Sequence, residues 1–351
     1  MKHMGVQKKI NNALERVTSK NYDKSLLQVL VYSDNYELNI KKSNIDPSQP
    51  FHVASIGKMF TATLIGMLAD KKRLRIEDKI SKYLSKEVLA GLFVYNGTDY
   101  KNEITIRALL GHTSGIADYF ESDVNAGSKF VEKIQDYPEK KWSPKELLDF
   151  TRSNQKTLSA PGEFHYSDTG YILLGLIIEH VTRKSFATIL DEMIFQPLRM
   201  RDSYLMFYKK TDKEIAPIWF NNKEISKLNL LSCDWAGGGI VSTLDDLLKF
   251  QKTYWKGELV SSSFMDEMSS TSNKFEPGIH YGLGMMELRF EEFFFLLRAL
   301  PKPKGHIGIL GTFMFYDTEN DLHFILNLGS NKKIPYGIRL LIKIESIIKK
   351  S

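Results

Sequence analysis

The sequence predicts an α/β fold of the α+β type, in which an antiparallel sheet is flanked by N- and C-terminal helices and carries an inserted all-helical subdomain. Strand-like runs occur near both ends of the chain, within residues 26–40 and 282–328. Residues 76–200, between them, show helical patterns instead. Helical patterns also occupy both termini. We therefore expect one sheet that is completed by both halves of the chain.

The N-terminal part is expected to hold a helix, a hairpin and a buried helix. Residues 6–18 carry apolar side chains at helical spacing, namely Ile10, Ala13, Leu14 and Val17. Two strands, at residues 26–32 and 36–40, flank a short polar turn. The run from residue 55 to residue 68 is apolar on all sides, which is typical of a helix buried centrally in a domain.

The middle of the chain is expected to be helical, with helix starts at Thr105, Ser143 and Asp168. Ser143 is followed by Pro144 and Glu146, a capping box with proline at the first helical position. After Ser203 we expect helices at residues 243–250, 262–268 and 336–349, and strands at residues 282–288, 293–297, 312–316 and 323–328.

These elements predict two domains. Residues 1–75 and 203–351 are expected to form the sheet domain, and residues 76–202 the helical domain. The active site is expected in the cleft between them.

Composition and charge exclude several function classes. The 351 residues are 42% hydrophobic and 26% charged, as in ordinary soluble globular proteins, and no apolar run approaches the roughly twenty residues of a membrane span. The net charge of +6 comes from scattered basic residues, without the basic stripe of a nucleic-acid interface. The net charge is the only sequence feature that favours binding to nucleic acid or to a membrane. The sequence does not indicate an oligomeric state.

Cysteine usage and the N-terminus say little about compartment. Cys233 is the sole cysteine, which excludes an internal disulfide and a multi-cysteine metal site. The first ten residues lack an apolar stretch, so no signal peptide is predicted in the chain as given. A cytoplasmic protein and an exported protein with its leader removed both fit this pattern.

Ser55 and Lys58 form an S-x-x-K tetrad at the start of the apolar helix. Three positions apart on a helix, they share one face about one turn apart. A serine hydroxyl is a weak nucleophile, and an adjacent lysine can take its proton or hold a further base in its charged form. A serine that begins a helix is also a common N-cap, so the tetrad alone does not decide the function.

Four further segments accompany the tetrad. They are His112-Thr-Ser-Gly-Ile116, Phe164-His-Tyr-Ser-Asp168 with its continuation to Gly175, Ala236-Gly-Gly-Gly-Ile240 with its continuation to Asp246, and Gly305-His-Ile-Gly-Ile-Leu-Gly311. In this order and spacing they resemble the serine β-lactamase-like superfamily, specifically its branch of class C β-lactamases, DD-peptidase penicillin-binding proteins and family VIII esterases. The resemblance runs from about Ser55 to Gly329 and implies a β-lactamase/transpeptidase-like fold.

The resemblance implies a serine hydrolase with Ser55 as nucleophile. Tyr166 matches the tyrosine of the family's Y-x-N motif as a candidate base, and we expect the charge of Lys58 to lower the pKa of its phenol. Whether Lys58 or Tyr166 takes the serine proton stays open, because their titrations are coupled. The backbone N–H groups of Ser55 and Ile309 are the expected oxyanion donors. No metal or organic cofactor is required.

The implied substrate site departs from the family pattern at two positions. Asp168 stands where asparagine is common, so it is expected to pair with Lys58 and lacks an amide donor for the substrate. His306, Ile307 and Gly308 align with the K-T-G strand, in which histidine is common among the family's esterases and peptidase relatives. Ile307 lacks the threonine hydroxyl that helps to hold a carboxylate. Gly308 is expected to keep side-chain bulk away from the acyl group.

Three further features are expected to be structural. The turn that contains His112 is expected to end a helix, with Gly115 at positive φ and without a chemical role. The glycines of residues 237–239 are expected to allow close backbone packing beside the site. His165, Glu179 and His180 lack the spacing of a metal site.

The expected function is hydrolysis through a Ser55 acyl-enzyme of a small-molecule or peptide-like ester, amide or β-lactam. The alternatives are a carboxylesterase or D-amino-acid peptidase of the same fold, and a penicillin-binding or sensor module without turnover. Asp168 and Ile307 both favour substrates other than β-lactams, because each position lacks a donor that a β-lactam would use.

Overall fold

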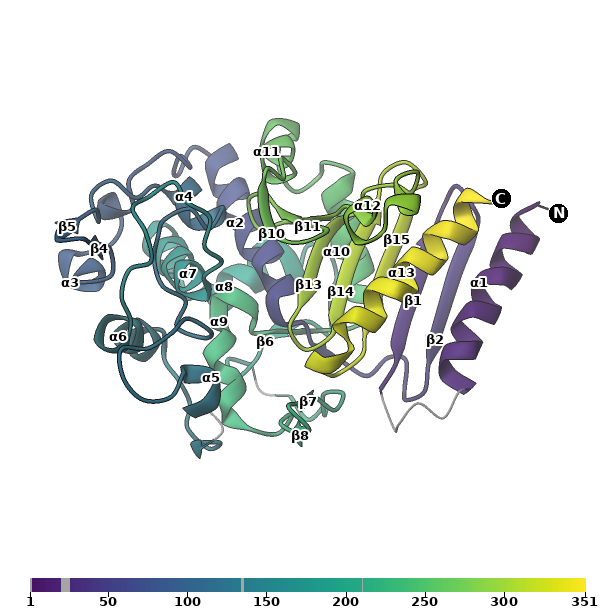
Figure 1. Ribbon diagram of the computed structural model, residues 1–351, viewed down its shortest axis with the longest axis horizontal. Coiled ribbons are helices and arrows are strands. Elements are labelled where there is room, and N and C mark those ends of the chain that lie inside the picture. The colour runs from purple at the N-terminus through teal and green to yellow at the C-terminus, as the bar shows by residue number, and fades with distance from the viewer. Residues whose placement is uncertain (1, 20–25, 134–135, 210) are drawn as a thin grey trace.

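The computed structural model, which describes residues 2–19, 26–133, 136–209 and 211–351, is built around an eight-stranded antiparallel sheet (Figure 1). Its strands follow in the spatial order β10 (Asn273–Glu276), β11 (Ile279–Tyr281), β12 (Met286–Leu288), β13 (Lys304–Gly308), β14 (Thr312–Asp317), β15 (Leu322–Asn327), β1 (Gln28–Ser33) and β2 (Leu38–Ser43). The N-terminal hairpin therefore extends a sheet made by the C-terminal part of the chain, which confirms the predicted fold class.

Both faces of this sheet are covered by helices. The terminal helices α1 (Lys2–Ser19) and α13 (Ile334–Lys349) pack side by side on one face, and α10 (Leu244–Trp255) packs on the other (Figure 1). Alternation along the strands separates the two cores: Val29 and Val31 belong to the cluster under the terminal helices, whereas Leu30 belongs to the cluster that includes α10. Burial on both faces explains why Val29, Leu30 and Val31 form an unbroken apolar run in β1.

The helical part surrounds α2 (Gly57–Asp70), which packs against α7 (Asp168–Thr182) and α9 (Trp235–Gly238). The capping box predicted at Ser143 is present at the start of α6 (Pro144–Asn154). Further short helices are α3 (Lys86–Leu89), α4 (Ile106–Leu110), α5 (Phe130–Lys133), α8 (Phe186–Leu190) and α11 (Ser262–Met268). Within the described residues no helix is long and apolar enough to cross a membrane. The division into two domains stays a prediction.

Short strands fix the chain around α2. A three-stranded sheet pairs β9 (Ile240–Ser242) with β3 (Phe51–His52) and β6 (Tyr204–Leu205), so the segment just before Ser55 is held in register by β9. Two small hairpins lie elsewhere: β4 (Val94–Tyr95) with β5 (Thr98–Asp99), and β7 (Trp219–Phe220) with β8 (Lys223–Glu224).

Two predicted strands differ from the structure. The run at residues 282–288 is mostly a tight connection between β11 and β12, in which Gly284 has a φ of +75°. The strand predicted at residues 293–297 is wrong, because this segment forms α12 (Phe290–Phe293) and a single 3-10 turn. Its backbone bonds are local, from Phe294 N–H to the Phe290 carbonyl and from Leu297 N–H to the Phe294 carbonyl. A short apolar run does not by itself distinguish a strand from a helical turn.

Candidate active site

Ser55 lies in a 3-10 turn, Ala54–Ile56, that leads directly into α2. Ala54 has a φ of +50°, a conformation that costs a non-glycine residue on the order of 1–3 kcal/mol. The surroundings hold this conformation in place: the Ala54 N–H donates to His52 Nδ1 at 3.1 Å, and Gly238 packs so tightly on Ala54 that an added Cβ would come within 2.7 Å of it. A strained turn held from both sides fixes the direction of the Ser55 side chain.

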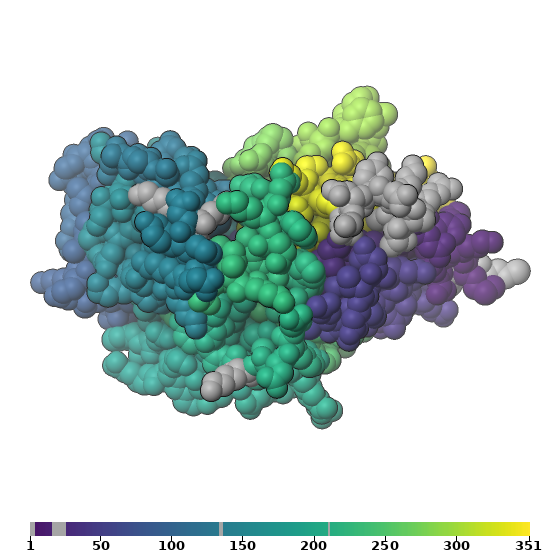
Figure 2. Space-filling view, turned by 90° about the horizontal axis from the view of Figure 1, so that it is seen from below, coloured from purple at the N-terminus to yellow at the C-terminus, as the bar shows by residue number. Residues whose placement is uncertain are grey.

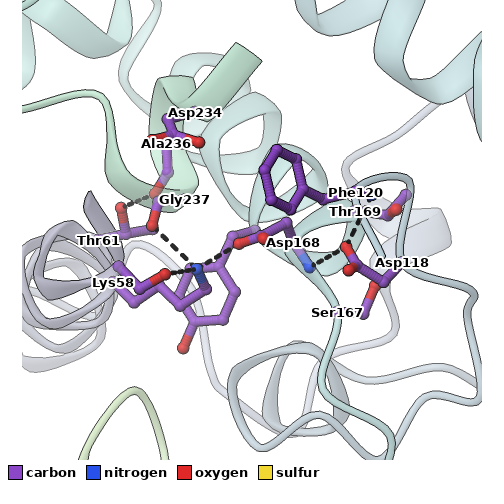
Figure 3. A network of polar contacts seen from close by, with 12 residues as sticks. Lys58, Thr61, Asp118, Phe120, Ser167, Asp168, Thr169, Asp234, Ala236 and Gly237 are labelled. Carbon is purple, nitrogen blue, oxygen red and sulfur yellow. Dashed lines mark hydrogen bonds and ion pairs between the residues drawn. The ribbon is translucent and has the colours of Figure 1, made fainter. Parts of the chain in front are cut away.

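Lys58 is fully buried, and its ammonium group has three acceptors. Nζ lies 3.1 Å from Ser55 Oγ and 3.0 Å from the carbonyl oxygen of Gly237, and it forms an ion pair with Asp168 (Figure 3). It also lies 5.0 Å from the centroid of the Tyr166 ring. A buried cation requires such partners. The structure therefore brings together four of the seven predicted site residues, namely Ser55, Lys58, Tyr166 and Asp168.

Asp118, which sequence reasoning missed, fixes the position of Asp168. Its carboxylate accepts hydrogen bonds from the backbone N–H groups of Asp168, Phe120 and Glu121, at 3.0, 3.3 and 2.9 Å (Figure 3). The loop at residues 118–121 is thereby tied to the first residue of α7. Burial, and secondly the negative charge of Asp168, raise the pKa of Asp118 to about 7.

Tyr166 lies on the cavity wall, two residues before α7 begins. Burial is the largest cause that raises the pKa of its phenol well above the ordinary value, and the negative charge of Asp168 adds to it. A side-chain hydrogen bond with Ser55 acts in the opposite direction. The pKa of Tyr166 is therefore raised, whereas we expected Lys58 to lower it, because burial and the Asp168 carboxylate are the largest causes.

His112 contacts the site, although its turn was expected to be structural only. Its Nδ1 accepts a hydrogen bond from the Ser167 N–H at 3.0 Å, and its ring centroid lies 4.3 Å from that of Tyr166. Burial, together with the charge of Lys58, lowers the pKa of this imidazole well below its ordinary value. A neutral His112 therefore holds the backbone of Ser167 and packs on the ring of Tyr166, the two residues before Asp168. Gly115 has positive φ, as predicted.

His306 and Gly308 are not among the residues that line the cavity. The His306 ring is buried, with Nδ1 2.7 Å from the Ile307 carbonyl oxygen and Nε2 3.2 Å from the Tyr281 hydroxyl. Burial and the charge of Lys58 lower its pKa to about 3, so it offers no positive charge to a substrate. A Cβ at Gly308 would come within 2.1 Å of Thr312 Oγ1, so strand packing by itself requires a glycine here, and the role expected for Gly308 beside the acyl group stays a prediction.

Ser55 and Ile309 both line the cavity. Within the described part of the chain, neither backbone N–H has a hydrogen-bond acceptor. Unpaired N–H groups beside a nucleophile are what stabilisation of an oxyanion requires. Their role stays a prediction.

The cavity at Ser55 has a volume of about 590 Å³, and its lining residues include two chemical classes, which we call the acidic wall and the apolar wall. The acidic wall consists of the carboxylates of Glu121, Asp168, Asp234 and Glu276. The apolar wall consists of Phe120, Phe275, Pro277, Ile279, Met286, Phe293, Ile307, Ile309, Ile334, Pro335, Ile338 and Ile342. Arg339 is the one basic residue among the described lining residues.

Of the acidic wall only Asp168 was predicted, because Glu121, Asp234 and Glu276 come from a loop, a 3-10 helix and β10, which share no sequence motif. Burial, then the charge of Asp168, raise the pKa of Asp234 to about 7. The same two causes raise the pKa of Glu121. Crowding of carboxylates makes each one harder to ionise and would make a bound cation favourable.

Comparisons with known proteins place the chain in a family. The Beta-lactamase family model matches residues 16–344. Protein flp of Staphylococcus aureus (strain MW2) is 32% identical over 164 residues, which are 46% of this chain and 29% of that protein, so the match spans less than a third of that relative's length.

Among solved structures, D-amino acid amidase from Ochrobactrum anthropi SV3 matches with a TM-score of 0.80 and 21% identity over 99% of both chains. EstCE1, a hydrolase with promiscuous acyltransferase activity, matches with a TM-score of 0.78 and 17% identity, again over 99% of both chains. At these identities the structures show a shared fold. Since the family model spans nearly the whole chain, the protein belongs to the Beta-lactamase family, a hydrolase family with this fold.

Proposed function

We propose that the protein is a serine hydrolase that works through an acyl-enzyme on Ser55. The observation that carries the proposal is the buried Lys58 ammonium, held between Ser55 Oγ, the Asp168 carboxylate and the Gly237 carbonyl. Burying a lysine ammonium costs free energy, and here the partners that offset this cost hold the ammonium against a serine hydroxyl. It is the arrangement that activates a serine for attack on a carbonyl.

The reaction follows from these contacts in two half-steps. Ser55 Oγ attacks the substrate carbonyl carbon, and its proton passes to the deprotonated member of the Lys58–Tyr166 pair, either a neutral Lys58 amine or a Tyr166 phenolate. The N–H groups of Ser55 and Ile309 stabilise the oxyanion, and the leaving group departs with a proton from the same pair. Water then attacks the acyl-enzyme in the reverse sense and regenerates Ser55.

We further propose that the preferred substrates are esters or amides that carry an ammonium group beside an apolar group. The acidic wall favours a cation, and the apolar wall favours a hydrocarbon side chain. A carboxylate-bearing β-lactam meets four carboxylates and only one basic side chain at this cavity. D-amino acid amidase, one of the structural neighbours, has a name that fits such a substrate.

Covalent labelling tests the nucleophile. The intact mass of the protein is measured after incubation with a fluorophosphonate, for the wild type, Ser55→Ala and the control Ser263→Ala, which alters an exposed serine on α11. We expect one adduct on the wild type and on the control, and none on Ser55→Ala. An adduct that survives in Ser55→Ala would refute the assignment.

A matched substrate pair tests the preference for a cation. D-phenylalanine p-nitroanilide carries a free ammonium, and its N-acetyl derivative has the same leaving group without that charge. We expect kcat/KM to be at least about tenfold higher for the free amine, with nitrocefin below both p-nitroanilides. Preference for the acetylated substrate or for nitrocefin would contradict the role given to the acidic wall while leaving the nucleophile assignment intact.

A further inference from the structure

The segment at residues 293–296 exposes apolar side chains to solvent. Phe294, Phe295 and Leu296 are 52%, 66% and 63% exposed, and Phe293 is 37% exposed. We call these four residues the aromatic knob. Figure 2 shows this part of the chain as a yellow-green projection at the top of the molecule. Single exposed apolar residues are common on protein surfaces, but four in succession indicate a surface that binds something.

The knob is held rigidly. Glu292, directly before it, pairs with Lys274 at 2.8 Å and His280 at 2.6 Å and accepts the N–H of Gly278 at 3.2 Å. The Phe293 ring packs on Gly278, where an added Cβ would come within 2.5 Å of it. The 3-10 turn closes the tip with a bond from Leu297 N–H to the Phe294 carbonyl. The apolar side chains are therefore presented in a fixed arrangement that does not collapse onto the core.

Basic residues surround the knob. Arg298 lies two residues after the knob and is exposed, and Lys349 of α13 donates a hydrogen bond to the Ala299 carbonyl. Within the described residues neither side chain, nor the neighbouring Lys350, forms an ion pair with a carboxylate. Lys302 lies close by and pairs with Glu291 at 2.9 Å. An apolar tip next to unneutralised positive charge is complementary to an anionic lipid surface.

We propose that the aromatic knob docks the protein on anionic bilayers, with Phe294, Phe295 and Leu296 inserted among the acyl chains at the interface and with Arg298 and Lys349 against the headgroups. The shape favours a bilayer over a protein partner. A stable protein interface buries roughly 800 Å² on each side with complementary packing, whereas the knob is a narrow convex tip of four side chains. Aromatic and leucine side chains are those that partition into the bilayer interface.

Docking in this way would bring the catalytic cavity close to lipid. Phe293 is both a member of the knob and part of the apolar cavity wall. The apolar wall thus continues from the cavity that contains Ser55 to the docking surface. The docking proposal does not depend on the proposed chemistry, and Ser55→Ala is expected to bind vesicles as well as the wild type does.

Vesicle sedimentation tests the proposal with the full chain. The probes are large unilamellar vesicles of phosphatidylcholine alone and of phosphatidylcholine with 30 mol% phosphatidylglycerol. We expect binding to the anionic vesicles, at least fivefold weaker binding to the neutral ones, and a decrease as salt rises from 50 to 500 mM. Phe295→Ser/Leu296→Ser should bind at least tenfold less, and Arg298→Gln/Lys349→Gln should lose the preference for phosphatidylglycerol.

Two controls keep the test sharp. Trp219→Ser removes another exposed apolar side chain, 43% exposed, on β7 and should bind like the wild type. Hydrolysis of a soluble ester should be unchanged in Phe295→Ser/Leu296→Ser, because neither residue lines the cavity, and this shows that the variant is folded. Equal binding of the wild type and the knob variant would overturn the proposal. So would a wild type that sediments with neither vesicle but forms a dimer that the knob variant loses.

Discussion

Two regions around Ser55 differ in how the chain builds them. In the buried network at Lys58, which does not itself line the cavity, the ammonium has three acceptors, and Asp118 receives three backbone N–H groups. The apolar lining from β13 and α13 offers isoleucine side chains and, among the described lining residues of these two elements, no side-chain donor for a carboxylate beyond Arg339. We propose that the buried network serves proton transfer and that the cavity lining, acidic and apolar together, selects the substrate. The variants below test this separation.

The largest effect is expected at the nucleophile and its lysine. Ser55→Ala and Lys58→Ala should each lower kcat/KM for an activated ester by about 10⁴-fold or more, because each removes one member of a unit that transfers one proton. The double variant should be no worse than the poorer single variant. Steady-state kinetics checks this, and a double variant as poor as the product of both single effects would show that the residues act independently.

Asp168→Asn should change the pH dependence more than the maximum rate. The charge of Asp168 is the second largest cause that raises the pKa of Tyr166, and asparagine keeps an oxygen acceptor for Lys58 without that charge. The pKa of the phenol should fall, so the ascending limb of the kcat/KM profile should move to lower pH by about one unit.

The dependence of kcat/KM on pH, recorded for Ser55→Cys, serves as a control, because in this variant the nucleophile itself titrates. If the ascending limb of the kcat/KM profile of Asp168→Asn lies at the same pH as that of the wild type, Tyr166 does not take part in the rate-limiting proton transfer.

These residues also show what sequence reasoning reaches and what it misses. The Ser55–Lys58 contact follows from helical spacing alone, and strand runs at both ends of the chain predicted that both halves complete one sheet. Asp118 and Asp234 were missed because their roles depend on loops that meet only in three dimensions. The exposed knob was predicted as a strand, because periodicity does not report whether an apolar run is covered.

Asp234→Asn should have a smaller effect, confined to cationic substrates. Asp234 has a pKa of about 7, so it is mostly protonated below pH 7 and ionised above it. For the wild type, KM of an amine-bearing substrate should therefore fall as pH rises through 7, while asparagine should abolish that fall and raise KM about tenfold at pH 8. The N-acetyl substrate should be unaffected. An equal loss for both substrates would assign Asp234 to folding instead of recognition.

Asp234→Asn should also change how the stability of the folded protein depends on pH. The folded-state pKa of Asp234 lies above its ordinary value of 3.8, so the folded protein binds more protons than the unfolded chain between pH 4 and 7. Its contribution to stability is therefore full below pH 4 and is lost as pH rises to about 7. Asp234→Asn should unfold at a higher temperature than the wild type at pH 8, and thermal scans at pH 4 and pH 8 check this.

Ile307→Thr should have the smallest effect and tests the apolar wall directly. Ile307 lines the cavity and is 7% exposed, so a threonine hydroxyl placed there could donate to a carboxylate on the substrate. A hydrogen bond to a charged group contributes roughly 1.5–3 kcal/mol, but the hydroxyl must also be removed from water, and the ionised carboxylates of the acidic wall still repel an anion. We expect kcat/KM for nitrocefin, relative to a neutral ester, to rise by no more than about tenfold. Ile307→Val is the matched control, because it loses similar volume without a donor. A rise of a hundredfold or more in Ile307→Thr alone would mean that one missing hydroxyl, and not the acidic wall, excludes carboxylate-bearing substrates.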